Sequence, residues 1–134
     1  KNALSSITRQ YTYILIDSPG GLEHLNRKIA STVDIIFDVM GPSSKSFAHV
    51  RRAHRVISEV GIRFDRFFVI GGYGFTNDPD PGALAGLGLP YIGRIAQDET
   101  IAQMVLRGEC LLDTPAGSPA YRSVKMIIQQ VLRP

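Results

Sequence analysis

The residues best suited to chemistry form a short turn near the start of the chain. An apolar run over 13–16 ends in Asp17, Ser18, Pro19, Gly20 and Gly21. A carboxylate at a strand end can hold a hydrated Mg²⁺, and a nearby glycine amide lets a terminal phosphate approach without a side chain in the way. The alternative is that Asp17 only caps the following turn. The pattern therefore leaves two interpretations, a phosphate and magnesium site or a plain turn.

Histidines and neighbouring carboxylates offer weaker candidates for metal or proton chemistry. Glu23 and His24 are adjacent, and on a helix they would point about 100° apart, so they do not form a two-ligand face. Glu23 would favour the positive end of a helix, and His24 would be a switch or dimer contact. His49 and His54 are five residues apart, off the spacing that pairs zinc ligands, so we expect surface or boundary positions.

Composition excludes several classes of protein. The single cysteine, Cys110, cannot form an internal disulfide, and we expect it in the core of a cytoplasmic protein. The longest uncharged stretch, 81–93, is too short to span a membrane. A net charge of +3 is modest, so a dedicated nucleic-acid binder is not favoured.

One predicted helix carries a basic side. The residues are Lys45, Arg51, Arg52 and Arg55. They form either a solvated face or a docking surface for an acidic partner or nucleic acid. No aromatic residues interleave these cations, which weakens the nucleic-acid version.

The elements that position these residues alternate along the chain. Apolar runs predict strands, buried on both faces, over 13–16, 33–39, 66–70 and, more weakly, 89–95. Helical patterns cover 22–30, 43–60, 98–108 and 118–131, with Val124, Ile127, Ile128 and Val131 on one stripe of the last. Asp98 and Ser118 are expected N-caps, and Gly61 and Gly108 expected stops. The prediction is one α/β domain over 1–134, a parallel sheet flanked by helices on both faces.

Ligands of such sheets bind beyond the carboxyl ends of the strands, where 17–21, 41–43, 71–74 and 96–99 fall. The stretch from Asp17 to His24 (DSPGGLEH) resembles the D-S-P-A-G-(I/L)-E-H stretch of the deviant-Walker P-loop ATPases, the MinD/ParA-like members of the SIMIBI class. With Arg27 it looks most like the CooC-type accessory ATPase for nickel insertion into carbon-monoxide dehydrogenase. The likeness covers nearly the whole chain but only the C-terminal half of that family.

The resemblance implies a partial, Rossmann-like, three-layer P-loop NTPase fold. Asp17 would take the Walker B role, holding Mg²⁺ through water, and Gly21 would sense the γ-phosphate of ATP. The implied switch comprises Ser18, Pro19, Gly20, Gly21 and Glu23, and the implied base-side loops comprise Gly71, Gly72, Ala96, Gln97 and Asp98. His24 and Arg27 would be partner or dimer contacts of a homodimer that serves a metalloenzyme client.

The departures from the family pattern bear on activity. No Gly-Lys dipeptide occurs, so the lysine-bearing phosphate loop is missing from the sequence, and Gly71 or Gly72 replaces a base-reading Asn. We therefore expect a C-terminal fragment that does not hydrolyse ATP alone and needs no cofactor alone, with ATP and Mg²⁺ used by its full-length parent. Two other hypotheses stay open: a degenerate, non-catalytic partner-binding module, and a receiver-like domain with Asp17 as phosphoacceptor.

Overall fold

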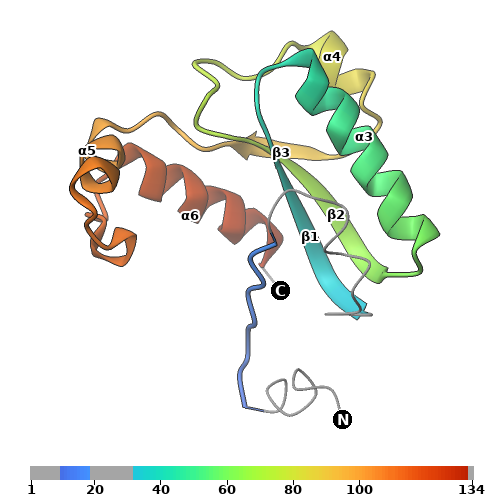
Figure 1. The fold of residues 1–134 in the computed structure, drawn as a ribbon, viewed down its shortest axis with the longest axis horizontal. Helices are drawn as coiled ribbons and strands as arrows, with labels where there is room; N and C mark the ends of the chain where they lie inside the picture. The colour runs from blue at the N-terminus through green and yellow to red at the C-terminus, as the bar shows by residue number, and fades with distance from the viewer. Residues whose placement is uncertain (1–9, 19–31, 133–134) are drawn as a thin grey trace.

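A three-stranded parallel sheet forms the centre of the fold (Figure 1). The computed structural model describes residues 10–18 and 32–132. The strands are β1 (Thr32–Met40), β2 (Arg63–Gly71) and β3 (Tyr91–Arg94), in the order β1-β2-β3. Both pairings are parallel, with Ile36 opposite Phe67 and Val69 opposite Tyr91. Three of the predicted strands are therefore confirmed.

Helices follow the strands as the alternation predicts. They are α3 (Ser44–Glu59), α4 (Pro81–Ala85), α5 (Glu99–Arg107), the 3-10 turn η1 (Leu111–Asp113) and α6 (Pro119–Val131). Successive side chains of a strand point to opposite faces of a sheet. Phe67 of β2 joins the core under α3, whereas the neighbouring Arg66 reaches the Val131 carbonyl oxygen of α6 at 3.0 Å. Helices thus cover both faces of the sheet, which confirms the α/β prediction.

The helix ends are set by local capping. The Ser43 hydroxyl accepts a hydrogen bond from the Ser46 amide at 3.2 Å, and the Asp80 carboxylate does the same for Ala83 at 3.0 Å. Gly108 ends α5 with a φ of 66°, in the left-handed region that side chains disfavour. The start of α4 within the loop after β2 was not predicted, because its five residues are too few for a helical pattern.

The core lies between α3 and one face of the sheet. Its members are Met40, Val50, Ile57, Phe67, Val69, Phe75 and Leu87. Val50 and Val69 are fully buried. Burial of an aliphatic side chain of this size contributes about 1.5–3 kcal/mol, so this cluster is the main apolar contribution to stability among the described residues.

The buried face of α6 differs from the predicted stripe. Ile127 and Val131 are buried, as expected, but Val124 is 40% exposed. The helix instead turns Ala120 and Ser123 inward. The stripe prediction was wrong at Val124 because it counted apolar residues alone and so passed over a small polar residue on the true inner face.

The predicted strand over 13–16 does not form. Residues 11–18 belong to no helix or strand, their side chains are exposed, and Leu15 is 92% exposed. In Figure 1 this blue segment runs outside the sheet. A parallel strand is stable only beside a partner strand, and none of the described strands pairs with these residues. An apolar run in the sequence does not determine whether a partner strand is present or where it lies. The predicted helix over 22–30 lies outside the described residues.

Candidate functional site

The carboxyl ends of the three strands bring two predicted segments together. The Ile95 amide donates to the Gly71 carbonyl oxygen at 2.7 Å, and the Gly72 amide donates to the Met40 carbonyl oxygen at 2.7 Å. The segment after β2 therefore lies between the end of β1 and the segment after β3. These loops meet at the edge where α/β proteins bind ligands.

Close packing favours glycine at the last position of β2, Gly71, and at the next position, Gly72. A Cβ on Gly71 would lie 2.9 Å from the Arg94 Cβ and 3.1 Å from the Tyr91 hydroxyl oxygen. A Cβ on Gly72 would lie 3.1 Å from the Met40 carbonyl oxygen. Gly71 and Gly72 thus let three backbone segments approach one another, which gives a packing reason for their presence.

Asp98 joins the starts of two helices. Its carboxylate accepts hydrogen bonds from the Thr100 amide at 2.9 Å, as the N-cap of α5, and from the Ala120 amide at 3.0 Å, in the first turn of α6. The Ser118 hydroxyl also donates to it. These bonds, that of Ser118 first, lower the pKa of Asp98 to about 2. The N-cap prediction is confirmed, and the carboxylate is held ionised at neutral pH.

The rest of this segment is also tied to α6. The Ala96 amide donates to the Ser123 hydroxyl oxygen at 3.0 Å, and that hydroxyl donates to the Ala120 carbonyl oxygen at 2.8 Å. Gln97, between Ala96 and Asp98, is exposed. Two of the three predicted base-side residues after β3, Ala96 and Asp98, are therefore bonded to α6, which the sequence alone did not predict. Ser123 was missed, although a lone polar residue on an inward helix position could have indicated it.

A polar cluster beside Gly71 was not predicted. The Tyr91 hydroxyl donates to the Asp78 carboxylate at 2.8 Å, and the Arg94 guanidinium lies 3.8 Å from the same oxygen. Burial, then the hydrogen bond and charge of Asp78, raise the pKa of Tyr91, while Arg94 opposes the rise. The cluster connects the loop after β2 to β3. It could not be predicted, because no sequence pattern indicates that these residues lie close together.

A carboxylate in β1, two residues before the end of that strand, also has a perturbed pKa. Burial raises the pKa of Asp38 in β1, and the positive charge of His49 lowers it in part. His49 itself is exposed and His54 is half-buried, with its ring edge-on to Phe64 and Phe67 at centroid distances of 5.9 and 5.0 Å. The expected surface or boundary positions are confirmed, with His49 at the surface and His54 at the boundary.

The residues predicted for magnesium and phosphate are only partly described. Asp17 and Ser18 are exposed on the segment outside the sheet, and no hydrogen bond or ion pair joins Asp17 to another described residue. The other predicted switch and contact residues lie outside the described residues: Pro19, Gly20, Gly21, Glu23, His24 and Arg27. The structure therefore does not bring Asp17 to the loops after β2 and β3.

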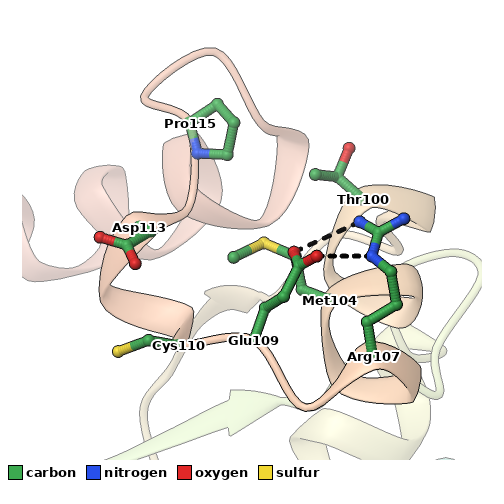
Figure 2. A pocket seen from close by; sticks show the side chains of 7 residues that line it. All are labelled: Thr100, Met104, Arg107, Glu109, Cys110, Asp113 and Pro115. Carbon is green, nitrogen blue, oxygen red and sulfur yellow. Dashed lines mark hydrogen bonds and ion pairs between the residues drawn. The ribbon is translucent and has the colours of Figure 1, made fainter.

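A shallow pocket of about 390 Å³ opens beside α5 and η1 (Figure 2). Its lining includes Met104, Arg107, Glu109 and Cys110. The Arg107 guanidinium and the Glu109 carboxylate neutralise each other through bonds of 2.6 and 3.3 Å, so the pocket presents no uncompensated charge from this pair. Cys110 is exposed, so its predicted core position was wrong. The apolar Leu111 and Leu112 after it suggested burial, yet both are exposed as well.

Residues 10–18 and 32–132 contain neither a cluster of metal-binding side chains nor a helix that could span a membrane. Within these ranges, no three His, Cys, Asp or Glu side chains gather closely enough to hold a metal ion. Within the same ranges, no helix has the length and apolar character needed to cross a membrane.

Comparison with known proteins gives distant relatives. No protein-family model matches the chain. It is similar to two uncharacterized ATP-binding proteins of Methanocaldococcus jannaschii. One is 23% identical over 98% of this chain and 53% of the relative, and the other is 25% identical over 92% of this chain and 49% of the relative. The chain thus spans about half the length of the curated relatives it matches.

A solved structure shares the fold. A ParA-family ATPase from Chlorobium tepidum superposes with a TM-score of 0.57 and 21% identity, over 82% of this chain and 42% of that one. The described strands and helices are therefore arranged as in part of the α/β fold of that protein.

The described residues fit only part of an ATP and Mg²⁺ site. Asp17 has the hard oxygen donors that Mg²⁺ prefers and no competing partner among the described residues. No glycine-rich loop with a lysine is available to surround a phosphate, because the sequence contains no Gly-Lys pair. The described residues therefore supply at most the carboxylate side of such a site.

Proposed function

We propose that the chain is the C-terminal part of an ATP-binding protein of the deviant-Walker, MinD/ParA-like class. The observation that carries this proposal is the match of nearly the whole chain to relatives named ATP-binding proteins, which are about twice as long. The fold shared with a ParA-family ATPase supports it. The DSPGGLEH stretch supplies the chemical reason, since its sequence holds a carboxylate and two glycines within five residues.

In this proposal the residues of the chain have separate roles. Asp17 would orient the water shell of Mg²⁺, and the Gly21 amide would meet the terminal phosphate of ATP. Loss of that phosphate would release the switch segment from Ser18 to Glu23. The loops at Gly71, Gly72 and 96–98 would border the base. The hydrogen bonds of Ile95 to Gly71 and of Ala96 to Ser123 support this, because they give a ligand at this edge a fixed wall.

The finer part of the proposal concerns the task of the full protein. By its likeness to the CooC type, it would act as a dimer, with contacts at His24 and Arg27, and would use ATP in the maturation of a nickel centre of a metalloenzyme. The likeness in the motif from Asp17 to Arg27 is the support for this step.

A nucleotide-binding experiment tests the proposal. A polypeptide that joins this chain to a preceding lysine-bearing phosphate loop should bind ATP-Mg²⁺ by calorimetry and hydrolyse it, whereas the 134 residues alone should do neither. Asp17→Asn in the longer polypeptide should lower kcat by at least about tenfold, with Asp113→Asn as the matched control. Normal hydrolysis by the Asp17 variant would remove the role assigned to Asp17. No heat with ATP-Mg²⁺ would favour the partner-binding module instead.

A further inference from the structure

A groove outside the carboxyl edge of the sheet lies between α3 and α4. It has a volume of about 430 Å³ and is lined by Pro42, Ser44, Phe47, Arg51, Ala83 and Gly86. Figure 1 shows α4 beside the beginning of α3, on the side of the sheet that α3 covers. The groove is therefore built by two helices and the turn that leads into α3, independent of the loops assigned to the base.

The floor of this groove is apolar. The Phe47 side chain is half-buried and packs against the core cluster, so its ring is fixed in place. Pro42 and the exposed Ala83 add further carbon atoms on either side. An apolar side chain from a partner could lie against Phe47 and Ala83 without moving the core. Such a pre-formed surface lowers the entropy cost of binding.

The described lining of the groove holds one basic side chain, Arg51, and further basic side chains lie along the same helix. Lys45, Arg51 and Arg52 are exposed and form no ion pair with any described residue. Arg55 is 3.8 Å from Glu59, but both side chains are mostly exposed, so that pair contributes little. The first turn of α3 contains no acidic residue, and the positive end of the helix dipole lies there.

The acidic groups of the neighbouring loop, Asp78 and Asp80, are bonded to other parts of the protein and form no ion pair with α3. Asp78 accepts the hydrogen bond of Tyr91 and lies near Arg94. Asp80 caps α4 through the Ala83 amide. The basic side of α3 therefore faces solvent with its charge available to a partner.

We propose that the groove between α3 and α4 binds an acidic segment of a partner protein. One apolar side chain of the segment lies against Phe47 and Ala83, and its carboxylates face Arg51 and the basic side of α3. Arg51 lines the groove itself, so it gives the specific contact, while Lys45 and Arg52 act through longer-range attraction. Nucleic acid fits less well, because Phe47 is the only aromatic residue in the described lining and its ring is held by the core.

Peptide binding tests the proposal. The probe is a fluorescein-labelled twelve-residue peptide of repeated Asp-Glu-Leu-Phe, titrated with the 134-residue chain and followed by fluorescence anisotropy. Arg51→Glu should weaken its binding at least about tenfold, because it places like charges opposite each other. Lys125→Glu makes the same charge change on the exposed side of α6 and should weaken binding less than about twofold.

Further variants and a second peptide test the contributions of α4 and of the apolar floor to binding. Ala83→Glu should also weaken binding, whereas Ala85→Glu, exposed on the same helix but outside the groove lining, should not. A peptide of Asp-Glu-Ser-Gly repeats should bind more weakly, since it lacks the apolar anchor. Circular dichroism of each variant verifies that the fold is kept.

Three results would overturn the proposal. The first is no binding of the probe at millimolar protein concentration. The second is equal weakening by Arg51→Glu and Lys125→Glu, which would show only general attraction. The third is a labelled single-stranded or duplex DNA that binds more tightly than the peptide with the same loss on Arg51→Glu, which would assign the groove to nucleic acid. Because none of these variants touches Asp17 or the base-side loops, failure here leaves the ATP proposal standing.

Discussion

Asp98 illustrates, at the scale of single residues, how a carboxylate expected near a ligand can be occupied by the protein itself. It accepts hydrogen bonds from the first turns of α5 and α6, and from the Ser118 hydroxyl. The bond to Thr100 could be predicted, because it is local and follows the N-cap rule. The bonds to Ser118 and Ala120 cross about twenty residues, and no sequence pattern signals them.

Acid should lower the stability of the fold, because it protonates the Asp98 carboxylate. Its folded-state pKa, lowered to about 2, lies below the unfolded value of about 4. The stabilisation it gives is therefore complete above about pH 4 and is lost as the pH falls toward about 2. Asp98→Asn should lower the thermal midpoint at pH 7 and flatten its decline in this range. Circular dichroism melts from pH 7 to pH 2 measure both effects.

The control for this prediction is Asp113→Asn. Asp113 is exposed, and no hydrogen bond of its side chain to a described residue is found. Its melts should follow those of the unsubstituted chain. If Asp98→Asn and Asp113→Asn declined with pH in parallel, Asp98 would not be the group that links stability to acid.

At the scale of elements, α6 is fixed to the sheet by a few polar bonds as well as by apolar contact. Ile127 packs 3.3 Å from the position a Gly93 Cβ would take, and the Arg66 guanidinium donates to the Val131 carbonyl oxygen. Ser123 connects the same helix to the loop after β3. The sequence predicted where this helix starts and that it is amphipathic, but the polar bonds depend on residues brought close only by folding.

Removal of the Ser123 hydroxyl should loosen this attachment. Ser123→Ala leaves the half-buried Ala96 amide without its partner, which costs about 1–3 kcal/mol of unfolding free energy. Urea denaturation followed by circular dichroism measures the loss.

Ser58 gives a matched control on α3. Its hydroxyl also donates to a carbonyl of its own helix, that of His54 at 3.1 Å, but accepts nothing from another element. Ser58→Ala should change the unfolding free energy by less than about 0.5 kcal/mol. Equal losses at Ser58 and Ser123 would mean that the bond to Ala96 does not stabilise the fold.

At the scale of the whole molecule, the sequence predicted the fold class and three strands, because long periodic patterns outweigh local exceptions. It was wrong for residues 13–16, which it predicted to form a buried strand. A uniformly apolar run predicts burial, but burial needs a neighbour that the run itself does not specify. For the same reason the sequence does not determine whether Asp17 comes close to the loops at Gly71 and Asp98.

The exposure of residues 13–16 can be tested in the 134-residue chain. Leu15 is 92% exposed, so Leu15→Lys should change the unfolding free energy by less than about 0.5 kcal/mol. Val69→Ala, at a position with 0% exposure, should lower it by about 1–3 kcal/mol. A loss at Leu15 as large as that at Val69 would show that the segment packs against the fold in solution.

The positions of the core residues along the sequence have a consequence for how the chain folds. The innermost apolar residues come from β1, α3 and β2, which are consecutive in the sequence, whereas α6 attaches from far along the chain. Contacts near in sequence close their loops at a lower entropy cost. The β1-α3-β2 unit can therefore assemble first and serve as the surface on which α6 docks. Partial opening would then begin with α6, and each such opening would free the loop after β3 that Ser123 and Asp98 hold.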